Sequence, residues 1–222
     1  MQIITTEIHK HLKLTIMKKI FTFALALVLS VSFAFAQSVN EGQVTILKTH
    51  VNGFTINVPK VDAKTANAAI TEYLADKGLV KPKTEDKYNS YRAQKFSYIG
   101  DGTYDIFFKA VQKGKKQDVS TDIIFICSLG NMNTISSSND ATATSNIKNF
   151  VSKFPRAIEK YQLKQRIEEI KKEIEAANKE KEKTDKEIQK LQEQIAKATE
   201  KQDALNRQLE QANTMLRNFT ID

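Results

Sequence analysis

The segment from Arg156 to Phe219 constrains the fold of this chain more than any other feature. It contains no glycine, its only neighbouring proline is Pro155 at its start, and it is rich in Lys, Glu and Gln. With Ile167 at position a of a heptad, apolar side chains recur at the a and d positions, which is the pattern of a coiled coil. The predicted oligomerisation or partner seam consists of Ile167, Ile170, Ile174, Ile188, Leu191, Ile195, Leu205, Leu209 and Leu216.

Two arrangements of this segment are compatible with its sequence. One is a continuous helix that would run from near Ser145 to Phe219, roughly 75 residues and about 110 Å, supported by oppositely charged i,i+4 pairs such as Glu175–Lys179. The other is a helical hairpin that turns near 178–185, where Lys181 and Thr184 occupy seam positions and a capping box begins at Thr184. The absence of Gly and Pro favours the continuous helix.

The charges beside the seam leave the oligomeric state and the orientation of the helices open. In a parallel homodimer Arg166 would face Lys171 and Glu180 would face Asp185, and both pairs are repulsive. The alternating Ile and Ala layers also suit close antiparallel packing.

A second apolar stripe precedes the seam. A helix is predicted to resume near Ser145, and its stripe includes Phe150, Phe154 and Ile158. The residues from Leu163 onward lie roughly on the opposite side of the helix. We therefore expect the first turns to pack on a preceding domain and the later turns to carry a separate surface.

The N-terminal residues have the pattern of a bacterial secretory signal peptide. A basic start at 17–19 and an apolar run at 20–33 lead to a small-x-small cleavage site between Ala36 and Gln37. The apolar run is shorter than a membrane span requires, so cleavage is favoured over anchoring. Whether residues 1–16 are translated is left open, because they precede a normal signal start.

The residues between the signal and the coil predict a small α+β head domain. A β-hairpin is expected over 43–59 with Asn52-Gly53 as its turn, followed by a helix over 63–77 capped by Asp62. Strands are expected at 91–99, 104–111 and 119–129. The predicted fold class is therefore α+β, a small antiparallel sheet with a packing helix followed by a long C-terminal helix. The expected divisions are 1–36 N-terminal extension plus signal, 37–130 head, 131–145 polar loop, 146–162 head-packing start of the long helix, and 163–219 coiled coil.

Composition argues against most catalytic and metal-binding classes. After residue 36 the chain has one histidine, His50, and one cysteine, Cys127. This pair cannot supply a zinc site of usual spacing or an internal disulfide. Cys127 lies on an apolar strand, which is typical of a buried inert thiol. No phosphate-binding loop is present. We therefore expect no enzyme activity, no cofactor and no metal.

The basic excess lies in the head, since the chain from Arg156 onward holds 15 basic and 14 acidic residues. The excess gathers in small lysine-rich turns at 81–87 and 109–116, which lack the arginines and aromatic residues typical of a nucleic-acid surface. They are interpreted as solubilising turns, with an anionic envelope polymer as a weaker possibility.

Several segments together resemble a group of uncharacterised exported proteins of Bacteroidetes. The similarity is carried by the signal ending Ala-Phe-Ala-Gln at 34–37, the strand Phe-Thr-Ile-Asn-Val-Pro at 54–59, the strand end at 128–130, and the Lys/Glu/Gln coil. The resemblance implies a cell-envelope location and transfers no functional residues. A second likeness, to periplasmic chaperones of the Skp type, rests on export, basic charge and a coiled coil.

The sequence as a whole predicts an exported structural or interaction protein, periplasmic or secreted, that acts through its C-terminal coil. Its partner would be itself or another envelope protein, without nucleic acid and without a membrane span after signal removal. One alternative is a Skp-like holdase chaperone. Another is a ligand-binding head with an apolar pocket lined by Tyr73, Tyr91 and Phe108.

Overall fold

The structure is a computed structural model, and it describes residues 38–115 and 118–219. The predicted signal peptide, its cleavage site at Ala36 and Gln37, and Lys116 of the second lysine turn lie outside these residues. Two compact units make up the described chain. The sheet unit comprises the described residues up to Ala66 together with Gly78–Lys153. The helix unit comprises Asn67–Lys77 together with the chain from Phe154 onward.

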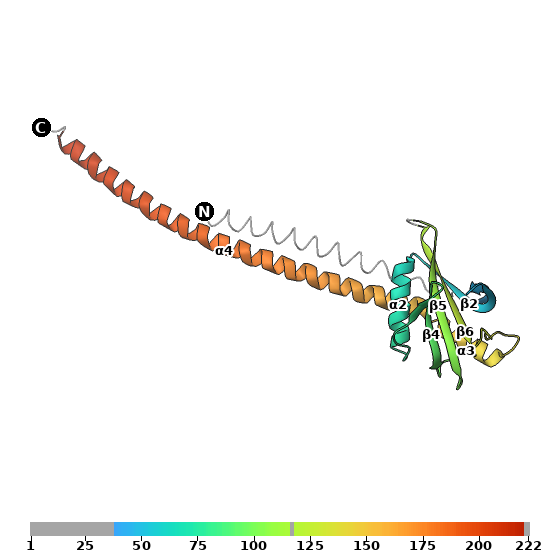
Figure 1. Ribbon diagram of the computed structural model, residues 1–222. Coiled ribbons are helices and arrows are strands. Elements are labelled where there is room, and N and C mark those ends of the chain that lie inside the picture. The colour runs from blue at the N-terminus through green and yellow to red at the C-terminus, as the bar shows by residue number, and fades with distance from the viewer. Residues whose placement is uncertain (1–37, 116–117, 220–222) are drawn as a thin grey trace. The chain divides into compact units, whose positions relative to one another are not determined.

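Six antiparallel strands form one sheet in the order β1-β2-β6-β5-β4-β3 (Figure 1). The strands are β1 (Asn40–Ile46), β2 (Thr49–Pro59), β3 (Lys83–Glu85), β4 (Tyr88–Lys95), β5 (Thr103–Lys113) and β6 (Ser120–Ser128). The helices are α2 (Ala63–Ala75), α3 (Ala141–Val151) and α4 (Phe154–Phe219). The predicted α+β class is confirmed, although β3 lies within the stretch 81–87, for which the sequence predicts a lysine-rich turn.

Helix α2 forms where its capping and apolar pattern predict it. The Asp62 carboxylate accepts hydrogen bonds from the Thr65 backbone N–H at 2.9 Å and from the Thr65 hydroxyl at 2.7 Å. The bond from the backbone N–H satisfies a donor that the first turn of a helix leaves open. Ile70 and Leu74 are fully buried, as their spacing predicts.

The predicted turn of the first hairpin is wrong. The turn lies at Leu47 and Lys48, whose φ angles are 49° and 62°, and Asn52 and Gly53 lie inside β2. Gly53 is opposite Gly42 of β1, and a Cβ atom on Gly53 would lie 2.7 Å from Cγ2 of Val44. Glycine is therefore required here for the close approach of a side chain across the ladder and not for a turn.

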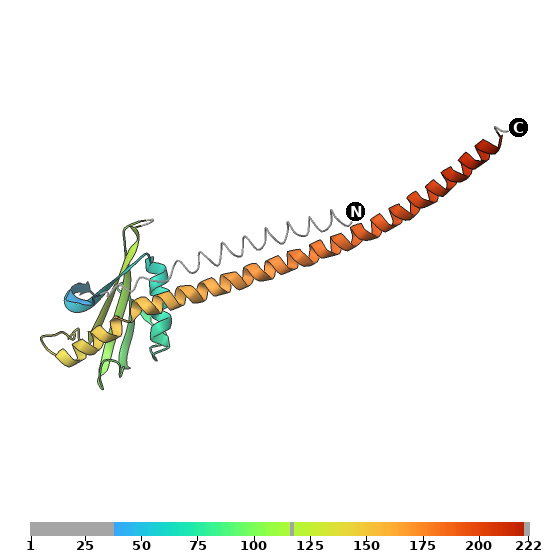
Figure 2. The ribbon, with the colours of Figure 1, turned by 180° about the vertical axis from the view of Figure 1, so that it is seen from behind.

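One face of the sheet packs against α3, which lies over the strands in Figure 2. The ring of Phe150 on α3 makes an edge contact with Phe96, with centroids 5.1 Å apart, and lies 6.0 Å from the ring of Phe125 on β6. All three side chains belong to the sheet unit. This packing explains why the strongly apolar strand β6 is buried on this side.

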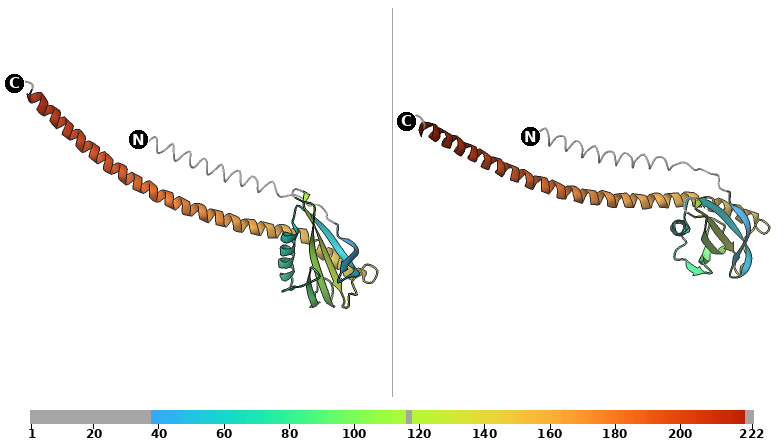
Figure 3. Two further views of the ribbon diagram at one scale, coloured as in Figure 1. Left: turned by 45° about the horizontal axis from the view of Figure 1, so that its top comes forward. Right: turned by 90° about the horizontal axis from the view of Figure 1, so that it is seen from above.

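The opposite face of the sheet carries a second apolar cluster. Its buried members are Ile46, Val51, Tyr88, Phe107 and Ile126. The sheet is curled, so that its two edges approach each other: the Leu47 backbone N–H donates to the Asp86 carboxylate at 2.7 Å, and the Tyr88 hydroxyl donates to the Thr45 carbonyl at 3.0 Å (Figure 3). The curl encloses this cluster.

The segment after β6 is ordered by hydrogen bonds. Asn131 and Met132 adopt φ angles of 49° and 58° in a tight turn, and Ser128 pairs with Thr134 as an isolated bridge. Asp140 then caps α3 by accepting from the Ala143 N–H at 2.8 Å. The prediction of a polar loop is therefore wrong for residues 141–145, because α3 begins at Ala141.

The predicted unbroken helix from Ser145 is interrupted between α3 and α4. Ser152 and Lys153 form a turn, and the Ser152 N–H donates to the Lys148 carbonyl at 2.9 Å. Pro155 follows at the start of α4. A proline ring disfavours a continuous helix across the preceding turn, yet it is well accommodated in the first turn of a new helix.

Candidate interaction surface on helix α4

Helix α4 is one continuous, gently curved element of 66 residues (Figure 3), roughly 100 Å long at 1.5 Å per residue. The alternative of a hairpin turning near 178–185 is wrong. The Thr184 hydroxyl donates to the Glu180 carbonyl at 3.1 Å, one turn back along the same helix. This internal bond takes the place of the helix cap that the sequence also allowed.

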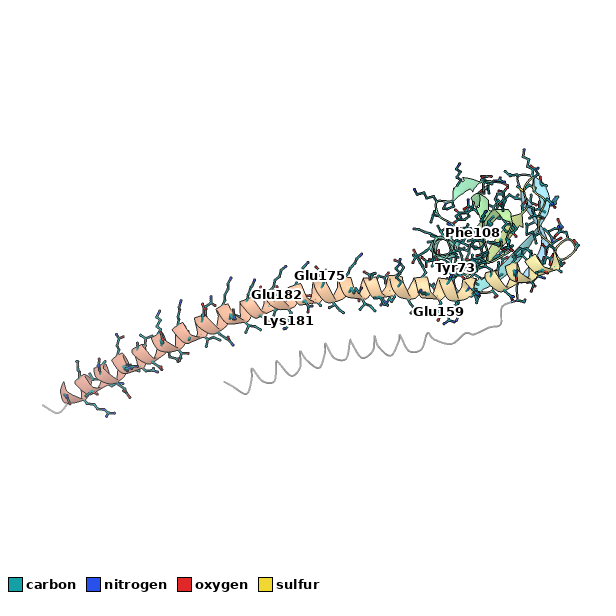
Figure 4. All side chains as sticks on the ribbon, turned by 90° about the horizontal axis from the view of Figure 1, so that it is seen from below. Tyr73, Phe108, Glu159, Glu175, Lys181 and Glu182 are labelled. Carbon is teal, nitrogen blue, oxygen red and sulfur yellow. The ribbon has the colours of Figure 1, made fainter. Side chains whose placement is uncertain are left out.

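Burial along α4 changes at the point where the apolar stripe changes sides. Phe154 is 0% exposed and Ile158 is 1% exposed, whereas Leu163 is 44% exposed. Ile170 is half-buried, and the other seam residues are exposed: Ile167, Ile174, Ile188, Leu191, Ile195, Leu205, Leu209 and Leu216. Figure 4 shows side chains leaving α4 on all sides along this stretch, among them Glu175, Lys181 and Glu182.

The first turns of α4 are tied to α2 within the helix unit. The rings of Tyr73 and Phe154 meet edge to face, with centroids 6.0 Å apart. The Lys164 ammonium lies 2.7 Å from the Glu72 carboxylate, and this bond raises the pKa of Lys164. Beyond Leu163 the seam residues are exposed, apart from the half-buried Ile170, and are therefore available for contacts with another helix.

Charged residues outside the seam support the helix locally. Ion pairs join Arg166 to Glu169 at 2.9 Å and Lys179 to Glu175 at 2.7 Å. Glu168 pairs with Lys171 at 2.8 Å, and the Lys171 hydrogen bond lowers the pKa of Glu168. Such exposed pairs contribute little stability each, so they solubilise and support the helix without specifying a partner.

His50 and Cys127 lie in different environments within the sheet unit. His50 is exposed on β2, and its Nδ1 lies 3.2 Å from the Thr45 hydroxyl. Cys127 is fully buried, and burial raises the pKa of its thiol. Within 38–115 and 118–219, no cluster of His, Cys, Asp or Glu has an arrangement that could hold a metal ion.

A polar cavity of about 440 Å³ lies beside β1, β2 and the turn after β6. His50 and Asn52 line it from β2, and Asn131, Asn133 and Ser138 line it from the turn. The sequence prediction did not find this cavity, although the Asn and Ser content of 131–139 was an available signal. The predicted pocket is different: Tyr91 and Phe108 are buried and stacked, with centroids 6.5 Å apart, so they fill core space.

Two lysines of the second predicted basic turn engage neighbours within the sheet unit. The Lys109 ammonium lies 4.1 Å from the centroid of the Tyr88 ring, and Lys113 lies 3.7 Å from the Asp122 carboxylate. Both contacts are local, which is the behaviour of a solvated strand surface.

The fold and the exposed seam define a class of protein: an α+β domain followed by a long helix with an exposed heptad face. No protein-family model, curated protein or solved structure matches the chain. Among the described helices, none is both long enough and apolar enough to cross a membrane.

Proposed function

We propose that the chain is an exported cell-envelope structural or interaction protein without catalytic activity, and that α4 binds its partner through the seam. The observation that carries this proposal is the exposure of large Ile and Leu side chains at heptad positions along α4. Soluble proteins rarely leave a long contiguous apolar surface open to water. Burial of one such side chain contributes about 1.5–3 kcal/mol, so covering the seam favours association.

The cell-envelope location is the part of the proposal that rests on sequence alone. It is supported by the signal-like pattern that ends at Ala36 and by the resemblance to exported Bacteroidetes proteins. An exported protein with a single cysteine has no internal disulfide, and oligomerisation is one way for such a protein to gain stability.

The test compares two double variants of the chain from Gln37. Ile188→Glu with Ile195→Glu places two charges in the seam. Gln189→Glu with Ala196→Glu adds the same charges at the same spacing, one residue away from each seam position. We expect affinity capture from an envelope extract, followed by mass spectrometry, to recover a specific protein with the natural chain and with the second variant, and to lose it with the first. A second copy of the chain counts as a specific protein in this test.

Equal recovery by both variants would contradict the proposal, because binding would then not depend on the seam. A helical circular dichroism spectrum shared by both variants is the control for folding. The natural chain could instead suppress the aggregation of an unfolded outer-membrane protein. If only Ile188→Glu with Ile195→Glu lost this effect, the seam would be assigned to the Skp-like holdase alternative.

A further inference from the structure

We propose that the partner of the seam is a second copy of the chain, running antiparallel and centred between Gln189 and Lys190. This inference rests on the proposed function, because it names the partner of the same surface. Among the side chains whose exposure the structure describes, Leu163, one heptad before Ile170, and Leu216 are the first and last exposed apolar residues of this face. The midpoint between them falls between Gln189 and Lys190. Alignment about this point therefore lets the two apolar faces overlap over their full length.

Most of the large apolar side chains meet one another in this alignment, while Ile167 faces Ala212 and Ile195 faces Thr184. In an antiparallel pair, each a position of one helix faces a d position of the other. The central layer then pairs Ile188 with Leu191, and each of the following layers occurs twice by symmetry. These layers pair Ile174 with Leu205, Ile170 with Leu209, and Leu163 with Leu216.

The polar seam positions meet small side chains where they need space. Lys181 faces Ala198, and Gln202 faces Ala177. An alanine leaves room for a long side chain to extend past it and keep its polar end in water. Thr184, the remaining polar position, faces Ile195 and already donates its hydroxyl to the Glu180 carbonyl at 3.1 Å.

The charges beside the seam agree with this alignment. When a partner helix is reversed, g positions face g positions and e positions face e positions, because the same edge of each helix is brought together. Glu180 then faces Lys201 of the second copy, and symmetry repeats this attractive pair. The other pairs join a charged residue to a neutral one or two neutral residues, and none joins like charges. They are Arg166 with Met215, Glu173 with Gln208, Glu187 with Gln194, Lys164 with Asn213, Lys171 with Asn206, Asp185 with Gln192, and Asn178 with Thr199.

Neighbouring antiparallel alignments are less favourable. A shift of one heptad towards the N-terminus brings Glu187 against Glu187 and Asp185 against Asp185. A shift of one heptad towards the C-terminus brings Lys181 against Leu205 and leaves Leu163 outside the overlap. The proposed alignment combines full overlap with the absence of like-charge pairs.

A parallel pair is less favourable for two reasons. It stacks Lys181 on Lys181 in the seam, and it brings Arg166 to Lys171 and Glu180 to Asp185. Like charges that face each other across a coiled coil select against that orientation.

Orientation is tested with spin labels on single engineered cysteines in the chain from Gln37. The buried thiol of Cys127, with its raised pKa, does not compete for the label. Double electron–electron resonance on Gln189→Cys is expected to give a distance within about 25 Å, because packed helix axes lie 8–10 Å apart. Labels at Gln165→Cys alone should lie roughly 75 Å apart. A mixture of Gln165→Cys and Thr214→Cys chains should restore a short distance. A short distance with Gln165→Cys alone would overturn the proposal in favour of a parallel pair.

Register is tested by reversing the charges of the proposed pair. Glu180→Lys and Lys201→Glu are each expected to weaken dimerisation about tenfold at low salt, since each creates two like-charge contacts. The double variant should return to within about twofold of the natural dissociation constant. Glu182→Lys, on the outward side of α4, is the matched control and should leave it unchanged. A double variant as weak as the single ones would overturn the register.

The two proposals fail in different ways. A chain that sediments as a monomer at high concentration excludes the second copy. The proposed function then still stands if envelope capture depends on Ile188 and Ile195. Capture that survives Ile188→Glu with Ile195→Glu contradicts the proposed function instead.

Discussion

Glu41 joins three separate parts of the sheet unit to strand β1. Its carboxylate accepts from the Asn52 amide at 2.7 Å and from the Ser137 N–H at 2.8 Å, and it lies 3.1 Å from the Lys148 ammonium. Burial by itself would raise the pKa of Glu41, but these hydrogen bonds outweigh it and lower the pKa below the ordinary value of 4.5. One side chain on edge strand β1 thus fixes the segment after β6 and helix α3.

Glu41→Gln is expected to lower the free energy of unfolding by about 1–3 kcal/mol. The amide keeps the size of the side chain but loses the charge that strengthens three hydrogen bonds. Urea denaturation followed by circular dichroism measures the change, with the exposed Glu182→Gln on α4 as control. Unchanged midpoints in both variants would show that the Glu41 contacts contribute no stability.

Acid is expected to destabilise the sheet unit through Glu41 and Glu85. The Arg92 hydrogen bond lowers the pKa of Glu85 from 4.5, as the contacts above do for Glu41. Because these folded-state values lie below the unfolded ones, the stabilisation is complete above about pH 4.5 and is lost as pH falls through the folded values. Melting temperatures measured from pH 6 to pH 3 should therefore fall, and less steeply in Glu41→Gln. A melting temperature independent of pH would contradict this.

At the scale of elements, the sequence predicts the strands and helices well and the turns poorly. Strands β5 and β6 and the face of α2 follow from their apolar periodicity, which burial enforces directly. The turn predicted at Asn52-Gly53 is not formed. Position 53 needs a glycine because the Val44 side chain leaves no room for a Cβ atom, and the resulting Asn-Gly dipeptide is the same as that of a hairpin turn. The true turn uses Leu47 and Lys48, which carry no turn signal.

The candidate site divides in the same way between what sequence can and cannot predict. The seam is predicted from heptads because helical periodicity places its residues on one side without tertiary information. The polar cavity beside Asn52 depends on how the turn after β6 folds back, which a local pattern does not encode. Pro155 explains the interruption of the helix at Ser152, but only if the preceding helix α3 is already known.

Lys48→Gly and Gly53→Ala are expected to act in opposite directions. Glycine at position 48 removes the cost of a left-handed residue and should stabilise the sheet unit by about 0.5–1 kcal/mol. Alanine at position 53 should destabilise it, because the new Cβ would meet Val44 Cγ2 at 2.7 Å. Thermal unfolding of both variants measures this. Destabilisation by Lys48→Gly with tolerance of Gly53→Ala would place the turn at Asn52-Gly53.

At the scale of the whole molecule, the chain combines a sheet unit with two buried apolar clusters and a helix unit whose long element exposes its apolar face. The proposed export adds a prediction for the N-terminus. Expression of the full chain in a Gram-negative host is expected to give a periplasmic protein that begins at Gln37, as read by mass spectrometry. Ala36→Asp should block this processing, because the cleavage site requires a small residue. A cytoplasmic protein with an intact N-terminus would contradict export.

The central claim is that the seam of α4 is an association surface, and sedimentation equilibrium of the chain from Gln37 tests it most directly. The natural chain and Gln189→Glu with Ala196→Glu should both sediment with the mass of a dimer at micromolar concentration. The Ile188→Glu with Ile195→Glu variant should sediment with the mass of a monomer. Its circular dichroism spectrum should remain that of a helical protein. If all three proteins sedimented as monomers, or if all three formed dimers of equal affinity, self-association through this seam would be contradicted.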